Sequence, residues 1–206
     1  MTATPRRTRR PAQPAPALPS LPDDFAVRVI AWQQRYGRHH LPWQNTGDAY
    51  RTWLSEIMLQ QTRVEAVIPY YQRFLSHFPT VKELAEADLD SINNLWAGLG
   101  YYSRARNLHS AAKQILQLHL GKFPRTKEEL LELKGIGPYT AAAIAAIAFD
   151  RAANVVDGNI ERVIARFTSS DVSFGAAPWR HAIAPQRTPA GTSFARSQPE
   201  PRYGKS

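Results

Sequence analysis

The chain has 206 residues and a formal net charge of +9, and it contains no cysteine. The lack of cysteine excludes disulfides, thiolate nucleophiles and metal or iron–sulfur centres held by thiolates. No apolar stretch is long enough to cross a membrane, and the arginines near the N-terminus precede a Pro/Ala tract instead of a signal-peptide core. We therefore expect a cytoplasmic protein without membrane contact.

The positive charge is concentrated at the two ends of the chain. Residues 1–20 contribute +4 and residues 168–206 contribute +3, which leaves +2 for the long segment between them. Because that segment is nearly neutral, bulk charge is only weak evidence for nucleic-acid binding. Any such argument has to come from local arrangements of residues.

Proline divides the chain into three regions. Residues 1–22 carry six of the 16 prolines and are typical of a disordered basic leader. Residues 168–206 carry five more without a sustained apolar period, so we expect an irregular tail there. The segment 23–167 between them has the patterns of one helical domain.

The first part of this domain predicts three helices. The first begins at Asp23 and Asp24 and runs to about Tyr36. The third covers residues 64–78, with Pro69 either near its start or at a kink. The second opens near Asp48. Its i, i+3, i+4, i+7, i+8 spacing places five apolar residues on one face: Tyr50, Trp53, Leu54, Ile57 and Met58.

Two helices follow in the middle of the domain. Asp88 can cap the first, which ends at Gly98 or Gly100. Ser103 can cap the second, which runs to about Leu120.

The last part of the domain predicts three more helices. Thr126 and Glu129 have the spacing of a capping box, and Pro138 suits the first turn of a helix that continues to Phe149. A final helix follows Asp157. Strand signals are absent, so we predict an all-α fold of short helices.

A tight turn joins two of these helices within residues 126–149, in the sequence LLELKGIGPYT. The turn consists of Lys134, Gly135, Ile136 and Gly137. Its glycines let a phosphate approach the chain, and the N–H groups at the start of the next helix point at that anion. This pattern is typical of a helix-hairpin-helix, which grips a DNA strand by its backbone. An ordinary helical hairpin is the alternative, and the motif does not separate an enzyme from a passive DNA-binding module.

Four further segments accompany the hairpin: LPWQ at 41–44, WLSEIMLQQT at 53–62, GLGYYSRARNL at 98–108 and VVDGNIERV at 155–163. Together they closely resemble the A/G-specific adenine DNA glycosylases of the helix-hairpin-helix base-excision repair superfamily, which are related to endonuclease III. The similarity runs nearly unbroken from about Phe25 to Arg166. The resemblance implies the helix-hairpin-helix glycosylase fold, double-stranded DNA with a mismatched adenine as the partner, and a monomer at the nucleoid.

The resemblance also implies a reaction. The family extrudes adenine mispaired with guanine or 8-oxoguanine from the duplex and hydrolyses its N-glycosidic bond. An acid must protonate the departing adenine while a carboxylate stabilises the cationic sugar. Glu56 matches the acid and Asp157 matches the carboxylate. Asn159 and Tyr139 match positions that hydrogen-bond around them and the substrate.

Each of these four residues also has an ordinary structural interpretation. Glu56 lies at the edge of the apolar stripe, where partial burial would raise its pKa, but it can equally be a solvated flanking residue. Asp157 and Asn159 can be capping residues at the start of a helix. Tyr139 can be a packed aromatic residue.

Four other residues match family positions that contact DNA. By resemblance, Gln61 and Tyr101 wedge into or stack on the opened duplex, which offsets part of the unstacking cost. Arg104 and Arg106 are expected to touch phosphates. A core position for Tyr101 and solvated helix charges for the two arginines are the alternatives.

Position 139 distinguishes two types of reaction. Bifunctional enzymes of the endonuclease III type hold a lysine there that forms a Schiff base with the sugar, whereas this chain has Tyr139. A monofunctional glycosylase follows from the resemblance. A thymine-mismatch glycosylase of the same superfamily can also carry Tyr at this position and is the alternative within the class.

The resemblance stops after Phe167. Family members continue into helices with four cysteines that hold an iron–sulfur cluster (4Fe-4S) and into a domain that helps to recognise 8-oxoguanine. This sequence has neither, so we expect no cofactor and interpret residues 168–206 as a frame-shifted or otherwise aberrant end. The helices from Phe25 to Phe78 would then expose apolar faces, which predicts a marginally folded, weakly active chain. A catalytically silent DNA-binding remnant is the alternative.

Overall fold

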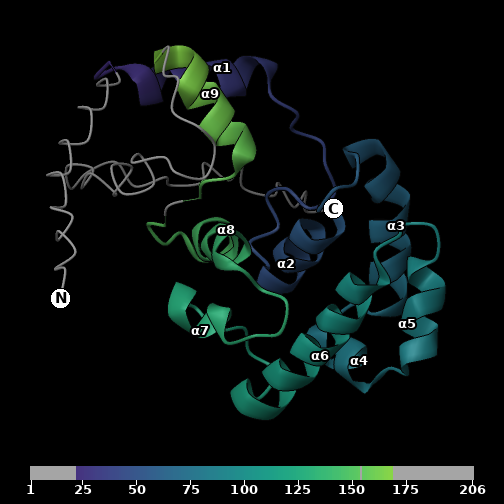
Figure 1. Cartoon of the computed structure of the whole chain (residues 1–206). Coiled ribbons are helices and arrows are strands. Elements are labelled where there is room, and N and C mark those ends of the chain that lie inside the picture. The colour runs from purple at the N-terminus through teal and green to yellow at the C-terminus, as the bar shows by residue number, and fades with distance from the viewer. Residues whose placement is uncertain (1–21, 154, 169–206) are drawn as a thin grey trace, which may run out of the picture.

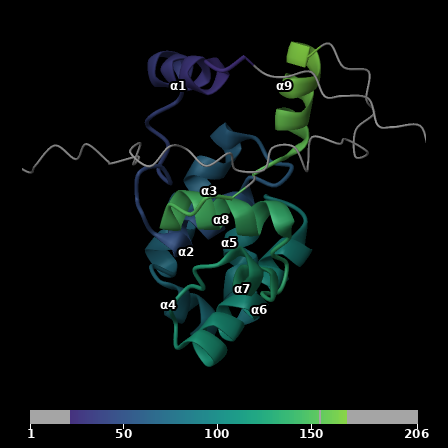
Figure 2. The same ribbon diagram turned by 90° about the vertical axis from the view of Figure 1, so that its left-hand side faces the viewer.

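The computed structural model describes residues 22–153 and 155–168. The predicted leader and tail lie outside this part of the chain, apart from Pro22 and Thr168. Every regular element within it is a helix, which confirms the predicted all-α fold. Figures 1 and 2 show the nine helices of the described part: α1 (Phe25–Tyr36), α2 (Ala49–Met58), α3 (Val64–His77), α4 (Val81–Glu86), α5 (Leu89–Trp96), α6 (Tyr102–His119), α7 (Lys127–Leu131), α8 (Pro138–Phe149) and α9 (Gly158–Thr168).

Helix α4 is absent from the sequence-based prediction, although its start signal is strong. Thr80 and Glu83 form a capping box at its first turn, as Thr126 and Glu129 do at α7. Because α4 has only six residues, it is too short for an apolar period to reveal it. The predicted cap at Ser103 is wrong, because α6 already begins at Tyr102.

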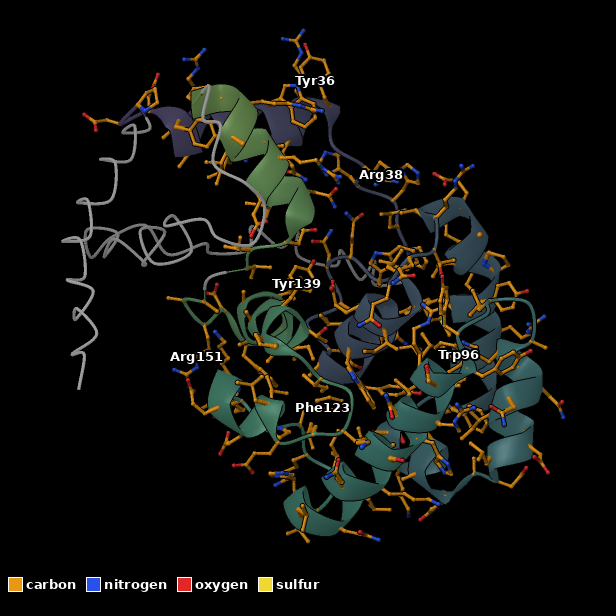
Figure 3. All side chains as sticks on the ribbon, viewed as in Figure 1. Tyr36, Arg38, Trp96, Phe123, Tyr139 and Arg151 are labelled. Carbon is orange, nitrogen blue, oxygen red and sulfur yellow. The ribbon has the colours of Figure 1, made fainter. Side chains whose placement is uncertain are left out.

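Helices α2 to α8 enclose one apolar core. All five residues of the predicted stripe on α2 are buried, and Trp53 is the largest of them. Phe74 on α3 and Trp96 on α5 are also fully buried and meet edge to face, with 5.9 Å between their ring centroids. Trp96 lies between α3 and α6 (Figure 3). The stripe therefore fixes α2 in the core, and Glu56 lies at the edge of this buried face.

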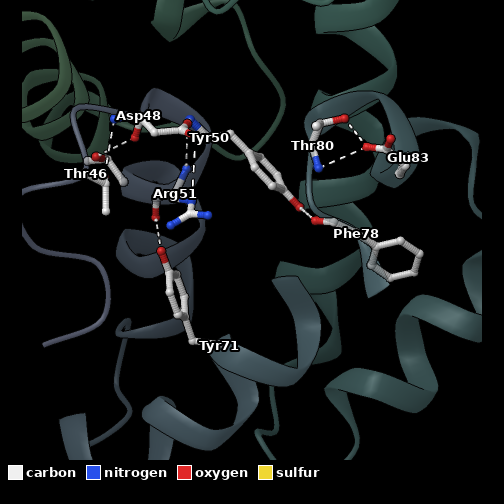
Figure 4. Close-up of polar contacts among 9 residues, drawn as sticks. Thr46, Asp48, Tyr50, Arg51, Tyr71, Phe78, Thr80 and Glu83 are labelled. Carbon is white, nitrogen blue, oxygen red and sulfur yellow. Dashed lines mark hydrogen bonds and ion pairs between the residues drawn. The ribbon is translucent and has the colours of Figure 1, made fainter. Parts of the chain in front are cut away.

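Hydrogen bonds cap the start of α2 and join it to α3 and to Phe78, the residue after α3 (Figure 4). The Asp48 carboxylate accepts from the backbone N–H groups of Tyr50 and Arg51 at 2.8 and 3.2 Å. The Tyr50 hydroxyl donates to the carbonyl of Phe78 at 2.7 Å, and the Tyr71 hydroxyl donates to that of Arg51 at 3.3 Å. Burial raises the pKa of both tyrosines, that of Tyr71 to about 12, so both hydroxyls remain donors at neutral pH.

Helix α8 packs against α2 and α7. The helix is buried on all sides along one run of mainly small residues: Thr140, Ala141, Ala142, Ala143, Ile144 and Ala145. These short side chains let the helix axes approach closely. The turn before α8 is equally tight, because Gly135 has a φ of +78° and a Cβ there would lie 2.7 Å from the Cβ of Asn107. Glycine is therefore required where the hairpin meets α6.

Helices α1 and α9 lie together at one end of the molecule, apart from the core (Figures 1 and 2). No residue of α1 is buried, and the rings of Phe25 and Phe167 meet with 4.8 Å between centroids. The predicted exposure of apolar faces from Phe25 to Phe78 is therefore confirmed for α1 and wrong for α2 and α3. Helices α5, α6 and α8 cover the faces of α2 and α3.

One substitution at two phenylalanines tests this division. Phe74→Ala should lower the free energy of unfolding by about 3–5 kcal/mol, because it opens a cavity in the core. Phe25→Ala should lower it by less than about 1 kcal/mol, because it removes one half-buried ring contact. Urea titrations followed by circular dichroism measure both. Equal losses would contradict a core confined to α2–α8.

Candidate active site

Three of the residues predicted for catalysis come together from different parts of the chain. Glu56 lies in the last turn of α2, Tyr139 in the first turn of α8, and Asp157 directly before α9. The packing of α8 on α2 brings the first two into contact. The charge of Asp157 lies close enough to raise the pKa of both. The fold thus builds one polar cluster from residues distant in sequence.

Glu56 is half-buried beside the buried stripe, where the helical spacing placed it. Burial is the main cause that raises its pKa, and the charge of Asp157 raises it further. A hydrogen bond with Tyr139 acts in the opposite direction and lowers it. The net shift is upward, so this carboxyl group keeps its proton to a higher pH than a solvated one, as a proton donor must.

Tyr139 lies on the side of α8 that faces the start of α9 (Figure 3). Burial raises its pKa to about 12, and the negative charges of Glu56 and Asp157 add to the shift. Its hydroxyl therefore stays protonated at neutral pH and donates to Glu56. Because 38% of the residue remains exposed, packing alone does not account for its position.

Asp157 has the capping geometry that was its structural alternative. Its Oδ1 accepts from the backbone N–H groups of Asn159 and Ile160 at 3.0 and 2.8 Å. Its Oδ2 accepts from the side-chain Nδ2 of Asn159 at 3.0 Å, and Arg162 donates in turn to Asn159 Oδ1. These bonds hold the carboxylate in one orientation near Glu56, so capping and a role in the cluster are compatible.

The two predicted wedge residues share an unusual backbone conformation. Gln61 and Tyr101 have φ values of +57° and +50°, in the left-handed region. For residues other than glycine this costs roughly 1–2 kcal/mol each, and such strain concentrates at functional sites. Tyr101 is 60% exposed, so its core alternative is wrong.

The structure separates the two predicted phosphate contacts. Arg106 is exposed on α6. Arg104 is only 8% exposed, and its guanidinium donates to backbone carbonyls, among them those of Ile57 and Gln60 at 3.0 and 2.6 Å. This inward placement differs from the phosphate contact expected for Arg104. No spacing in the sequence signals it, because its partners lie on a distant segment.

The hairpin turn lies at the surface, directly before the helix that carries Tyr139. Lys134, Gly135 and Gly137 are exposed, while Ile136 is buried beneath them. The backbone N–H of Lys134 donates to Gln114 Oε1 on α6 at 2.7 Å, a contact that the sequence did not reveal. Gly137 precedes α8 without a side-chain cap, so the first N–H groups of a 12-residue helix are available to an anion.

Residues 54–173 match the HhH-GPD superfamily of base excision DNA repair proteins. The chain belongs to this family. The matching region covers more than half of the chain and contains all the predicted site residues.

Two similar relatives of this HhH-GPD protein are adenine DNA glycosylases. That of Buchnera aphidicola subsp. Baizongia pistaciae (strain Bp) is 46% identical over 149 residues, which are 72% of this chain and 42% of the relative. That of Homo sapiens is 45% identical over 151 residues, which are 69% of this chain and 28% of the relative. The chain thus spans less than half the length of these relatives.

Two solved structures resemble the fold. A thermostable thymine-DNA glycosylase has a TM-score of 0.64 and 28% identity, covering 68% of this chain and 64% of its own. A non-covalent endonuclease III–DNA complex has a TM-score of 0.58 and 18% identity, covering 73% and 77% respectively. At that identity the second likeness shows the fold alone.

The residues present in this HhH-GPD chain do not fit an iron–sulfur cluster, because the sequence offers no thiolate ligand. Among the described residues, no group of three or more His, Cys, Asp or Glu side chains is arranged to hold a metal ion. No described helix is long and apolar enough to cross a membrane.

Glu56→Gln should raise the melting temperature of the chain by about 2–4 °C near pH 7–8. The folded chain binds the Glu56 proton more tightly than the unfolded chain does, so ionisation above the folded-state pKa lowers stability. Glutamine removes that cost. The gain should disappear below pH 4.5, the ordinary value, where both states keep the proton. Calorimetry from pH 4 to 8 measures it, and a gain independent of pH would contradict the raised pKa.

Proposed function

We propose that this chain carries an adenine-excision site and hydrolyses the N-glycosidic bond of adenine mispaired with guanine or 8-oxoguanine. It acts as a monomer on double-stranded DNA at the nucleoid. The observation that carries the proposal is the half-buried Glu56, with a raised pKa, beside Tyr139 and Asp157. The adenine DNA glycosylases at 41–46% identity support adenine as the base.

Glu56 is the acid in this mechanism. Its proton passes to the extruded adenine as the bond between the sugar and the base breaks, so that the base departs neutral. The Tyr139 hydroxyl donates to the Glu56 carboxylate that remains. The same bond holds the carboxyl group in place before the transfer. A tyrosine has no amine to attack the sugar, which favours a monofunctional reaction.

Asp157 stabilises the sugar cation. Its carboxylate is oriented by the start of α9 and by Asn159, so little reorganisation is needed as positive charge develops. Water then adds its hydroxyl group to the sugar carbon and releases a proton. The products are free adenine and an abasic site.

DNA is held from two sides. The hairpin offers the backbone N–H groups of Gly135 and Gly137 and the Lys134 side chain to a phosphate, and Arg106 offers a second cation. The exposed Gln61 and Tyr101 enter the duplex where the adenine leaves it.

A thymine-mismatch glycosylase is the second candidate. Its support is the thymine-DNA glycosylase structure, whose fold matches this chain at a TM-score of 0.64. The higher identity to adenine DNA glycosylases favours adenine. A DNA-binding remnant without activity is the third candidate.

A single-turnover assay with the full chain tests the function. We expect excision of adenine opposite 8-oxoguanine or guanine, and no excision of thymine opposite guanine. Glu56→Gln should slow excision at least 100-fold through loss of the proton donor, while the Kd for the duplex changes less than about twofold. Excision of thymine instead would support the second candidate, and binding without any excision the third. Parental excision by the variant would remove Glu56 from the mechanism.

Two variants at position 157 separate capping from catalysis. Asn keeps the N-cap and removes the negative charge, whereas Ala removes both. If Asp157 stabilises the sugar cation, Asp157→Asn should slow the chemical step by at least about 100-fold without changing thermal stability. Asp157→Ala should also lower stability by about 0.5–2 kcal/mol. Normal excision by Asp157→Asn, with a loss confined to Asp157→Ala, would leave capping as its role.

A further inference from the structure

Arg104 connects the end of α2 to the loop before α6. Its Nη1 donates to three carbonyl oxygens at the end of α2 and just beyond it: those of Ile57 and Met58, both at 3.0 Å, and Gln60 at 2.6 Å. Its Nη2 donates to the Thr62 hydroxyl at 3.4 Å and to the carbonyls of Leu99 and Gly100 at 3.2 and 3.3 Å. One side chain thus bridges two segments about 40 residues apart.

These partners flank the two exposed wedge residues. Gln60 and Thr62 stand on either side of Gln61, and Gly100 directly precedes Tyr101. Gln61 and Tyr101 both hold a left-handed backbone that residues other than glycine rarely adopt without support from their surroundings. The carbonyls that Arg104 binds belong to the peptide units around them, so the guanidinium fixes both turns at once.

Ring contacts extend this support to the Tyr101 side chain. The guanidinium carbon of Arg104 lies 5.4 Å from the centre of the Tyr101 ring and 5.6 Å from that of Trp96. Trp96 Nε1 also donates to the carbonyl of Gly100 at 3.1 Å. The inner side of the loop is therefore held while Tyr101 remains 60% exposed.

Arginine is suited to this place for a geometric reason. Its planar fork carries five N–H donors in fixed directions, whereas lysine offers three donors on one nitrogen atom. No ion pair joins Arg104 to a carboxylate in the described part of the chain, so carbonyl oxygens are its main partners. A buried cation with such partners is costly to place and specific in what it holds.

We propose that Arg104 is a positioning residue for base extrusion, which sets Gln61 and Tyr101 in the conformation that enters the opened duplex. The proposal rests on the proposed function, because that function assigns the wedge role to these two residues. Arg104 itself touches neither the base nor a phosphate.

Arg104→Lys tests the proposal in the free protein, where no DNA is needed. Lys113→Arg is the matched control, because it exchanges the same two side chains at an exposed position of the same helix. Amide hydrogen exchange should become at least tenfold faster in the segments 59–62 and 99–101 of Arg104→Lys. The control should exchange as the parent does. Unchanged exchange in both segments would overturn the proposal that Arg104 holds the two turns, whatever the chain does to DNA.

Base extrusion is measured in a Glu56→Gln background, which separates it from excision. The probe is a duplex with 2-aminopurine opposite 8-oxoguanine, whose fluorescence rises when the base unstacks. Arg104→Lys should lower the extruded fraction at least tenfold, with an unchanged salt dependence of binding, whereas Lys113→Arg should leave the extruded fraction unchanged. A shallower salt dependence with normal extrusion would make Arg104 a phosphate contact and overturn the proposal. If the Glu56→Gln protein with Arg104 intact extrudes no base while the exchange result holds, the proposed function fails. The support of both turns by Arg104 is then still shown.

Trp96→Phe provides a second test should Arg104→Lys fail to fold. Phenylalanine keeps an aromatic ring near the guanidinium but loses the hydrogen bond to Gly100. Exchange should increase in 99–101 and not in 59–62, with a smaller loss of extrusion in the same direction. If this variant exchanges and extrudes as the parent does, the hydrogen bond from Trp96 does not support the Tyr101 loop.

Discussion

The packing of α8 against α2 is the constraint on which the candidate site depends. The stripe of α2 buries five apolar side chains, each worth about 1.5–3 kcal/mol, whereas a pKa shift of one unit costs about 1.4 kcal/mol. The apolar term therefore dominates, and Glu56 is carried into partial burial by its neighbours. The alanines of α8 let Tyr139 come near enough to bond with it. Larger residues where α8 contacts α2 would separate the pair and expose Glu56 to solvent.

Helix α2 also links Glu56, through its C-terminus, to the loops that carry Gln61 and Tyr101. The last carbonyls of an α-helix have no partner within it, and they carry the negative end of its dipole. Arg104 of α6 donates to the last two carbonyls of α2, those of Ile57 and Met58, which follow Glu56 directly. A single cation therefore satisfies the helix end, holds the turn at Gln61 and reaches the loop of Tyr101. Movement of either loop would be transmitted to the helix that carries the acid.

Local signals in the sequence predict most of the fold, and tertiary contacts account for what they miss. Asp48, Asp88 and the Thr126 capping box mark helix starts because their bonds span two or three residues. Helical spacing places Glu56 at the edge of the buried stripe, but it does not decide between half-burial and a solvated position. Arg104 could not be placed from spacing, because an arginine at a helix start is ordinarily solvated and most of its partners lie at the end of α2 or just beyond it. The meeting of Glu56 with Asp157 likewise required the resemblance, since no period relates them.

The two carboxylates of the site differ in how firmly the fold holds them. Glu56 belongs to a helix that is bonded at its start, buried along its stripe and capped at its end. Asp157 directly precedes α9, which lies at the same end of the molecule as α1 and exposes about half of Val163 and of Phe167. Its own bonds reach α9 and not the core within the described residues. The core therefore fixes the acid, while the separation of the two carboxylates depends on how α9 is supported. In the proposed mechanism the stabilisation of a sugar cation by Asp157 falls off with distance, so the position of α9 sets that contribution, while the packing of α8 on α2 sets the environment of Glu56.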